Sequence, residues 1–199
     1  MKNVEDFYNA TAEKWAESGY SEEAEMPCLT DFVKEQAKGS RFLDLCCGCG
    51  YESARIQALG YDVVGIDFSD VSINIAKKKN PDIEFYKDDI LSDYSYIGKV
   101  DAIIVIAGLV HIETCQLRQA FLRMKDVIKE GGYLFITIGE GTGKLVDKSI
   151  TVIDGEEYDR NFIGHTLDEL ITASTGLFEF EREVGYDGTL WHNYIFKCK

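Results

Sequence analysis

This sequence is poor in basic residues and in proline, and each shortage narrows what the protein can be. Its 199 residues include 21 lysines and arginines against 35 aspartates and glutamates, which gives a net charge of −14. Nucleic acids and anionic membranes attract proteins through broad positive surfaces, and this composition offers no such excess. We therefore expect a partner that is neither a nucleic acid nor a membrane.

Long apolar runs are also missing. No stretch reaches the ~20 apolar residues of a membrane-spanning helix, and the polar start, MKNVEDFYNATAEKW, has no hydrophobic signal core. The simplest expectation is a cytoplasmic protein. With 45% hydrophobic residues and only two prolines, the chain is long enough to form one well-packed domain over residues 1–199.

The cysteines lack the spacing of a metal site. The chain has six, three of them in one tight turn: Cys28, Cys46, Cys47, Cys49, Cys115 and Cys198. The turn is not accompanied by repeated CxxC units, by a second cysteine pair or by a nearby histidine, so we expect no metal ion. Small, buried, reduced thiols are the default expectation for such residues.

The most informative segment is residues 41–69, RFLDLCCGCGYESARIQALGYDVVGIDFS. Two apolar strands flank a glycine turn, Gly48-x-Gly50, and a helix-like stretch, and the second strand ends at Asp67. Such a turn lets the backbone approach a ligand, and an acid ~20 residues downstream can accept hydrogen bonds from both hydroxyls of a ribose. The segment therefore predicts a nucleotide-cofactor site.

Two cofactor classes use this layout. A dinucleotide places its pyrophosphate at the turn, where a third glycine usually lets the helix pack closely. Here Ser53 stands at that third position, and Asp44 ends the first strand, where its charge would repel a pyrophosphate but would suit a sulfonium and an ammonium. A NAD(P)-dependent oxidoreductase is the alternative that this comparison leaves open.

Residues 44–50, DLCCGCG, and 65–69, GIDFS, resemble the first two motifs of the class I S-adenosylmethionine-dependent methyltransferases. Residues 124–134, MKDVIKEGGYL, are similar to a later segment of the same family. One departure is Cys46, where the family commonly has glycine. The resemblance covers roughly residues 44–199 and implies S-adenosylmethionine as the methyl donor.

Strands and helices alternate beyond this segment, which favours a doubly wound α/β sheet. Strands are expected at 83–86, 100–107 and 133–138, and helices at 70–79 and 116–129, the last capped by Gly131-Gly132. The resemblance implies a seven-stranded, mostly parallel sheet with an antiparallel C-terminal hairpin and helices on both faces. Residues 1–40 would form a helical cap, 41–138 the cofactor-binding core, and 139–199 a substrate-side loop followed by the hairpin.

The resemblance also assigns roles to residues at the strand ends. Asp67 would bind the ribose, Asp89 or its neighbour Asp88 the adenine amino group, and Asp44 the methionyl ammonium, directly or through water. Phe68 and Ile90 would enclose the adenine. The full set expected around the cofactor is Asp44, Cys46, Gly48, Gly50, Asp67, Phe68, Asp88, Asp89, Ile90 and Ala107.

The acceptor side is less specified. His111, after the 100–107 strand, is either a general base or a residue that shapes the pocket. Arg160 either clamps a substrate carboxylate or phosphate or forms a structural ion pair. The glycine-rich segment 139–144 fails the Walker pattern twice and is expected to be a connection beside the substrate.

A small molecule is the expected acceptor. The 100–107 strand is followed neither by the Asn-Pro-Pro-Tyr segment nor by the Pro-Cys pair of DNA-methylating enzymes, and we expect no appended recognition domain in this short chain. A protein that binds S-adenosylmethionine or its product without catalysis is a further alternative. Neither the oligomeric state nor the accepting atom (oxygen, nitrogen, sulfur or carbon) can be inferred from the sequence.

Overall fold

The computed structural model describes residues 1–21 and 25–199. Seven strands form one sheet in the order β10-β11-β5-β4-β1-β2-β3, and only β11 runs antiparallel to its neighbours. Its strands are β1 (Arg41–Leu45), β2 (Asp62–Asp67), β3 (Glu84–Lys87), β4 (Val100–Ile106), β5 (Ile128–Gly139), β10 (Phe178–Val184) and β11 (Trp191–Cys198). The expected mostly parallel, seven-stranded α/β sheet is confirmed.

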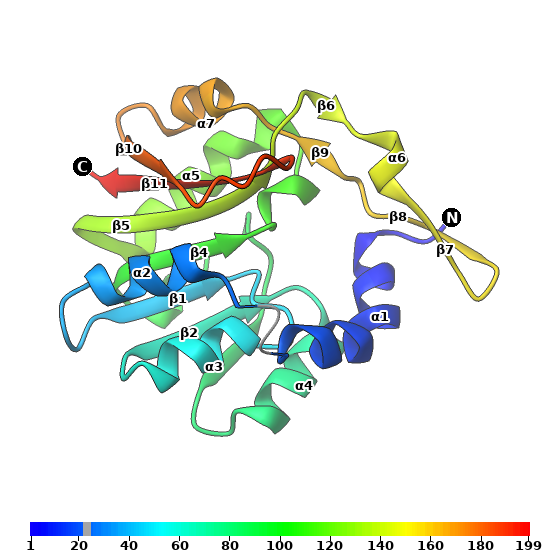
Figure 1. Ribbon diagram of the computed structural model, residues 1–199, viewed down its shortest axis with the longest axis horizontal. Helices are drawn as coiled ribbons and strands as arrows, with labels where there is room; N and C mark the ends of the chain where they lie inside the picture. Colours follow the sequence, from blue (N-terminus) through cyan, green and yellow to red (C-terminus); the bar gives the residue numbers. More distant parts are fainter. Residues whose placement is uncertain (22–24) are drawn as a thin grey trace.

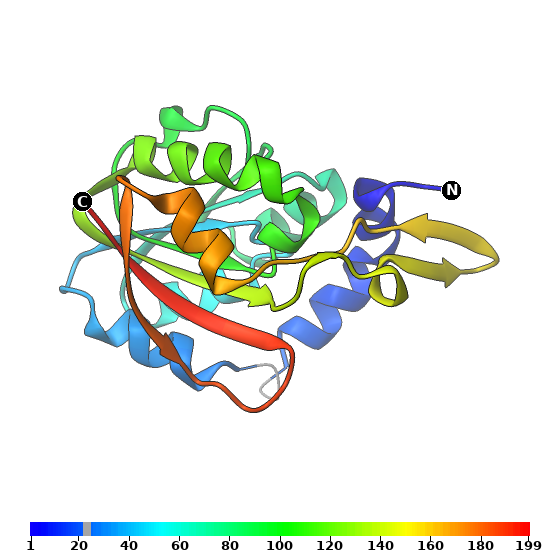
Figure 2. The same cartoon turned by 90° about the horizontal axis from the view of Figure 1, so that it is seen from above.

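Helices cover both faces of this sheet (Figures 1 and 2). They are α1 (Val4–Gly19), α2 (Pro27–Glu35), α3 (Tyr51–Ala58), α4 (Asp70–Lys79), α5 (Leu117–Val127), α6 (Val146–Ser149) and α7 (Leu167–Ser174), with short 3₁₀ turns at Ser95–Ile97, Leu109–His111 and Thr114–Gln116. No described helix has the length and apolar character needed to cross a membrane.

Alternating side chains of the strands divide the core into two layers. Phe42 of β1 belongs to the layer beneath α2, α3 and α4, where Phe32 and Ile56 are also buried. Leu43, its neighbour in sequence, belongs to the opposite layer beneath α5 and α7 with Phe121. The period of two along a strand produces this division, and it directs Asp44, two residues after Phe42, toward α3.

Helix α5 ends earlier than the sequence suggested. The structure ends it at Val127, and β5 begins at Ile128, so the expected helix 116–129 was too long and the strand 133–138 too short. Gly131, with φ +74°, lies inside β5, where the register against β4 shifts, and does not cap the helix. Its left-handed backbone lets the chain bulge within the strand.

Residues 139–165 are not the plain loop that was expected. They form two short antiparallel ribbons, one of β6 (Gly143–Lys144) with β9 (Ile163–Gly164), and one of β7 (Ile150–Ile153) with β8 (Glu156–Asp159). The second ribbon projects from the sheet toward the N-terminus (Figure 1). Main-chain hydrogen bonds of 2.8 Å join Lys2 to Glu157 and Asp159, so this ribbon and α1 form one wall.

The two N-terminal helices have different positions. Helix α1 lies beyond the carboxyl ends of the parallel strands, as expected of a cap (Figure 1). Helix α2 instead packs on the sheet through Leu29, Phe32 and Val33. The expectation that both helices cap the pocket was therefore wrong for α2, because its apolar side is buried against the strands; only its first turn borders the cavity described below.

Candidate active site

A cavity of about 540 Å³ lies where the parallel strands end, lined by residues of α1 and of the sheet. Its walls come from α1, from the loops after β1, β2 and β4, from residues 160–162 and from β11. The lining residues used below are Tyr8, Trp15, Cys46, Gly48, Asp67, Phe68, Ala107, Val110, His111, Thr137, Arg160, Phe162, Trp191 and Asn193. This is the position at which open α/β sheets bind ligands.

The loop after β1 brings backbone to the cavity surface. Gly48 and Gly50 have φ values of +51° and +79°, and a Cβ on Gly50 would come within 2.8 Å of the Phe85 ring. Cys46 has φ +66°, a left-handed conformation that costs a non-glycine residue about 1–3 kcal/mol. Gly48 and Cys46 line the cavity, whereas Gly50 lies beneath it as the residue before α3.

Asp67 ends β2 with its carboxylate on the cavity wall. It is 6% exposed; its Oδ2 accepts from the Gly48 N–H at 2.9 Å and its Oδ1 accepts from the Ser69 N–H at 2.8 Å. Burial raises the pKa of Asp67 to about 6, and those two hydrogen bonds act against the rise. Each carboxylate oxygen has a fixed donor and a further lone pair.

Asp44 lies beneath the turn and not on the cavity wall. Its side chain is buried, and its Oδ2 accepts a hydrogen bond of 2.6 Å from the Ser53 hydroxyl at the start of α3. Burial raises the pKa of Asp44 to about 7. The bond explains why serine stands where a dinucleotide fold has glycine: Ser53 gives a buried acid its partner.

The residues expected at the adenine end lie outside the cavity. Asp88 accepts from the Tyr96 hydroxyl at 3.0 Å, and Asp89 accepts from the Leu91 N–H at 2.8 Å. Ile90 is buried in the core. Phe68 does line the cavity, where its ring meets Tyr8 edge-on at 5.9 Å between centroids. Of the expected cofactor residues, the structure thus brings Cys46, Gly48, Asp67, Phe68 and Ala107 together on the wall.

His111 lines the cavity beside Tyr8 and has a partner on each ring nitrogen. Its Nδ1 lies 2.9 Å from the Arg160 carbonyl, which can only accept, so Nδ1 carries the hydrogen. In the neutral ring Nε2 then accepts, and the Tyr8 hydroxyl donates to it at 2.8 Å. Burial lowers the pKa of His111 to about 4. The ring is therefore neutral and fully hydrogen-bonded near pH 7.

Arg160 lines the same end. Its guanidinium carbon lies 4.9 Å from the Phe7 ring centroid and 5.6 Å from that of Phe162. One terminal nitrogen donates to the Lys148 carbonyl. No carboxylate among the described residues pairs with Arg160, so within that part of the chain the expected alternative of a structural ion pair is not formed.

A family model for a methyltransferase domain matches residues 42–132, the segment that contains both the Asp67 strand and the loop of Cys46 to Gly50. Over these residues the chain matches a methyltransferase domain, and its seven-stranded sheet is mostly parallel and Rossmann-like.

Curated relatives share part of this methyltransferase domain. A demethylmenaquinone methyltransferase of Renibacterium salmoninarum is 32% identical over 98 residues, which are 49% of this chain and 40% of that protein. The same-named protein of Paenarthrobacter aurescens is 34% identical over 98 residues, 49% of this chain and 38% of that protein. The chain thus matches less than half the length of these relatives.

Solved structures resemble the chain over nearly its whole length. The complex of DhpI with SAH has a TM-score of 0.78 at 18% identity and covers 98% of this chain and 95% of that one. Magnesium protoporphyrin IX methyltransferase of Synechocystis PCC 6803, with bound SAM, has a TM-score of 0.71 at 15% identity, covering 98% and 94%. These likenesses establish the methyltransferase fold.

Several lining residues of the methyltransferase domain were not singled out as site residues from sequence. Tyr8 was expected only as part of the helical cap of residues 1–40, and Phe162, Trp191, Thr137 and Asn193 were not identified. The Thr137 hydroxyl donates to the Asn193 Oδ1 at 2.7 Å, which leaves the Asn193 amide nitrogen at the cavity. The sequence did contain a signal for this pair, namely one polar residue in each of two otherwise apolar strands, because buried polar side chains need partners.

No group of three or more histidine, cysteine, aspartate or glutamate side chains in residues 1–21 and 25–199 is arranged to hold a metal ion. Cys46 and Cys47 lie in the turn with burial raising the pKa of each thiol well above its ordinary value. These cysteines are therefore protonated near pH 7.

Proposed function

We propose that this protein transfers a methyl group from S-adenosylmethionine to a small-molecule acceptor. The observation that carries the proposal is the Asp67 carboxylate, which lies on the cavity wall with one backbone donor on each oxygen. Its remaining lone pairs suit the two hydroxyls of a ribose. The family match over residues 42–132 supports the same conclusion.

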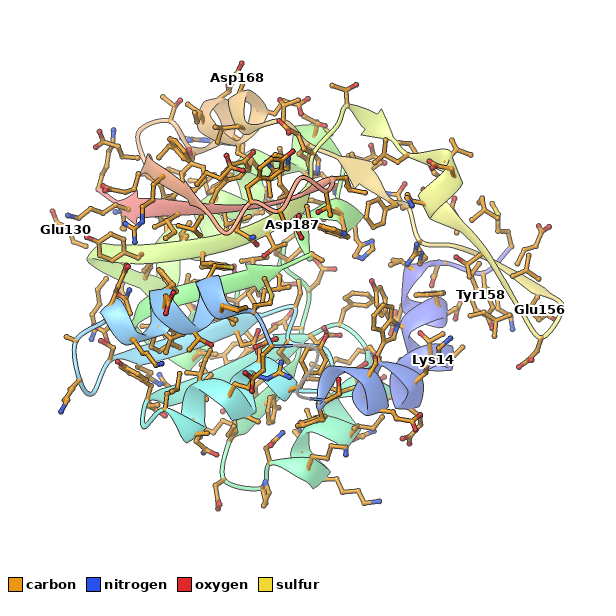
Figure 3. All side chains as sticks on the ribbon, in the orientation of Figure 1. Lys14, Glu130, Glu156, Tyr158, Asp168 and Asp187 are labelled. Carbon is orange, nitrogen blue, oxygen red and sulfur yellow. The ribbon has the colours of Figure 1, made fainter. Side chains whose placement is uncertain are left out.

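The cavity also suits the charge of this donor. Its carboxylates, Asp67 with the exposed Glu25 and Asp187, favour a ligand with a sulfonium and an ammonium over a pyrophosphate. Asp187 comes from the turn between β10 and β11 (Figure 3). The buried Asp44 would contribute indirectly, because its hydrogen bond from Ser53 holds the first turn of α3 in place beneath the cavity.

The remaining cofactor assignments are part of this proposal. Phe68 would pack on the nucleoside, with Cys46, Gly48 and Ala107 against the methionyl part and Gly50 allowing the turn. We assign the adenine end to Asp89 or Asp88 with Ile90, because β3, which they follow, is the neighbour of β2. In the structure, their side chains do not reach the cavity.

S-adenosylmethionine supplies a methyl group on a good leaving group, so alignment of the acceptor is the main task of the protein. Tyr8, His111 and Phe162 enclose the acceptor end and exclude water from it. His111 holds Tyr8 through Nε2 and the Arg160 backbone through Nδ1, and we assign it a positioning role because neither nitrogen is free. The acceptor atom would enter in line with the methyl–sulfur bond.

The cavity volume supports a small acceptor. About 540 Å³ falls within the roughly 300–1,000 Å³ of small-molecule sites. Two relatives are named for small organic acceptors, demethylmenaquinone and magnesium protoporphyrin IX. The net charge of −14 argues against a nucleic acid.

Calorimetric titration with S-adenosylmethionine, S-adenosylhomocysteine and NAD tests the proposal. We expect the two sulfur ligands to bind one per chain and NAD to bind far more weakly. Binding of NAD without either sulfur ligand would favour the oxidoreductase alternative. Release of S-adenosylhomocysteine from S-adenosylmethionine in the presence of acceptors would separate an enzyme from a protein that only binds the cofactor.

A further inference from the structure

Arg160 differs from the other arginines of this acidic chain. Four of the others lie within 4.0 Å of a carboxylate: Arg41 with Asp62, Arg55 with Glu52, Arg123 with Asp126, and Arg182 with Glu35. Arg118 is bonded to two carbonyl groups at the surface. Arg160 alone of these arginines lines the cavity.

The Arg160 guanidinium also has unused donors. In the described part of the chain, only one terminal nitrogen has a hydrogen-bond partner, the Lys148 carbonyl. The Nε is enclosed by protein without a partner, so an anion in the cavity would be bound through the terminal nitrogens. Leaving a partly buried cation without a counter-ion is costly, even though 35 acids are available in the sequence. Its position at the cavity indicates that an external anion completes the site.

Two aromatic rings lie close to this guanidinium. The ring centroids of Phe7 of α1 and Phe162 lie at 4.9 and 5.6 Å from its central carbon. A guanidinium beside aromatic rings keeps the N–H donors at its edge for a planar or tetrahedral oxyanion. Phe7 contacts Tyr158, which belongs to strand β8 of the ribbon (Figure 3), so the wall formed by the ribbon and α1 holds Arg160.

The acceptor end offers no free histidine base. Both nitrogens of His111 are hydrogen-bonded, and burial lowers its pKa to about 4. A neutral alcohol or a protonated amine would need to lose a proton during transfer. An oxyanion already carries the attacking lone pair and needs no base.

The rest of the acceptor end is apolar. The Phe162 and Trp191 rings meet edge-on at 5.8 Å, and Val110 lies beside them on the wall. The Asn193 amide supplies one polar point. These surfaces suit a small organic acid with an apolar or aromatic body.

We propose that the methyl acceptor is an organic oxyanion, a carboxylate or a phosphoryl group on an apolar body, bound by Arg160 and methylated on oxygen. This inference rests on the proposed function. One oxygen lone pair of the anion forms the new O–C bond while the C–S bond breaks and its electron pair stays on sulfur. The products are a methyl ester and neutral-sulfur S-adenosylhomocysteine, and no proton is transferred.

Binding of model acids to the protein saturated with S-adenosylhomocysteine tests the anion site at Arg160. The probes are benzoate and phenylphosphonate, with benzamide as the neutral match of benzoate. We expect both acids to bind, benzamide to bind at least about tenfold more weakly, and Arg160→Gln to weaken the acids by about tenfold or more, the loss of one charge-assisted contact. Arg182→Gln, at an exposed surface pair, is the matched control and should change nothing.

Three results would overturn the anion site: equal binding of benzamide and benzoate, unchanged acid binding in Arg160→Gln, or no acid binding to protein that still binds S-adenosylhomocysteine. Retained S-adenosylhomocysteine affinity in Arg160→Gln shows that the variant is folded. If the unaltered protein does not bind S-adenosylhomocysteine, that result would contradict the proposed function and not the anion site at Arg160.

The accepting atom is tested with methyl-labelled S-adenosylmethionine and a protein-free extract of cellular metabolites. A carboxylate methyl ester releases labelled methanol under mild alkali. A phosphoryl methyl ester resists alkali, but its labelled methyl group shows coupling to phosphorus in NMR spectra, whereas N-, S- and C-methyl products show neither property. We expect label in one of these two ester forms, reduced by Arg160→Gln and unaffected by Arg182→Gln. Alkali-stable label without coupling to phosphorus would overturn O-methylation of the anion, and absence of any transfer would contradict the proposed function itself.

Discussion

The two ends of the cavity are built in different ways. At the cofactor end, the loop after β1 and the end of β2 lie within residues 41–69, and the bond from the Gly48 N–H to Asp67 spans 19 residues. At the acceptor end, Tyr8 is bonded to His111 across 103 residues, and His111 to Arg160 across 49. The first end is therefore built mainly from one continuous segment, with Ala107 and residues 88–90 added after β4 and β3. The second exists only when three distant segments meet.

This difference separates two properties of the protein. Changes in the continuous segment should alter binding of the methyl donor, whereas changes in the assembled end should alter the acceptor and the docking of α1. A variant that alters one of these properties and leaves the other unchanged supports the comparison. Variants that alter both ends equally would contradict it.

Asp67→Ala should have the largest effect. It removes a buried acceptor of charge-assisted hydrogen bonds, so S-adenosylhomocysteine affinity should fall by about thirtyfold or more, roughly 2 kcal/mol. Calorimetric titration measures the loss. Asp168→Ala, on α7 far from the cavity (Figure 3), should leave the affinity unchanged. Equal affinities in the two variants would remove Asp67 from the cofactor site.

Ser53→Ala should have the second-largest effect, a decrease in the free energy of unfolding. The buried Asp44 loses its side-chain donor, which should reduce the free energy of unfolding by about 1–2 kcal/mol. Because burial already raises the pKa of Asp44 to about 7, its protonation stabilises the folded state at low pH, and that contribution is lost as the pH rises through 7. Urea unfolding at pH 6 and pH 8 should therefore show the larger loss at pH 8.

The matched control for that change is Ser18→Ala, in the exposed last turn of α1, which should cost little at either pH. A loss for Ser53→Ala that is larger at pH 6 would contradict the assignment of a raised Asp44 pKa.

Tyr8→Phe should affect only the assembled end. It leaves the buried Nε2 of His111 without a donor while keeping the ring that packs on Phe68, so the free energy of unfolding should fall by about 1 kcal/mol with little change in S-adenosylhomocysteine affinity. Tyr186→Phe, at an exposed tyrosine, is the control. A loss of cofactor affinity as large as that of Asp67→Ala would show that the two ends are not separate.

The smallest predicted effect is on the pH dependence of cofactor binding. Burial raises the pKa of Asp67 to about 6, and the ionised form is the one that accepts ribose hydroxyls. S-adenosylhomocysteine affinity should therefore decrease by about fourfold between pH 7.5 and pH 5.5 as the carboxylate becomes protonated. Calorimetry across this range should show no such decrease in Asp67→Asn, whereas Asp44→Asn should keep it.

The same division explains what the sequence could predict. The alternation of strands and helices and the position of Asp67 follow from local patterns, namely continuous apolar strands, a glycine turn and an acid at a fixed distance. The seven-stranded sheet was implied by the family resemblance. The burial of Asp44 could not be inferred, because a strand that is buried on both faces does not show which polar residue finds a partner on the next helix. Ser53, the partner, looked only like a missing glycine.

Tyr8 and the ribbons of residues 139–165 were beyond prediction for another reason. The polar, glycine-rich composition of 139–144 resembles a loop, and the ribbon of β7 and β8 is joined to α1 through main-chain bonds at Lys2. Such long-range contacts leave no periodic signal in either segment. The sequence likewise could not show that Arg160 has no carboxylate partner among the described residues, because that depends on which distant segments surround it.

A structure of the complex with S-adenosylhomocysteine tests the assignment of the two cavity ends most directly. We expect both ribose hydroxyls on the Asp67 carboxylate and the sulfur facing the space bounded by Tyr8, His111 and Arg160. A ribose held elsewhere, or a sulfur facing away from Arg160, would contradict it.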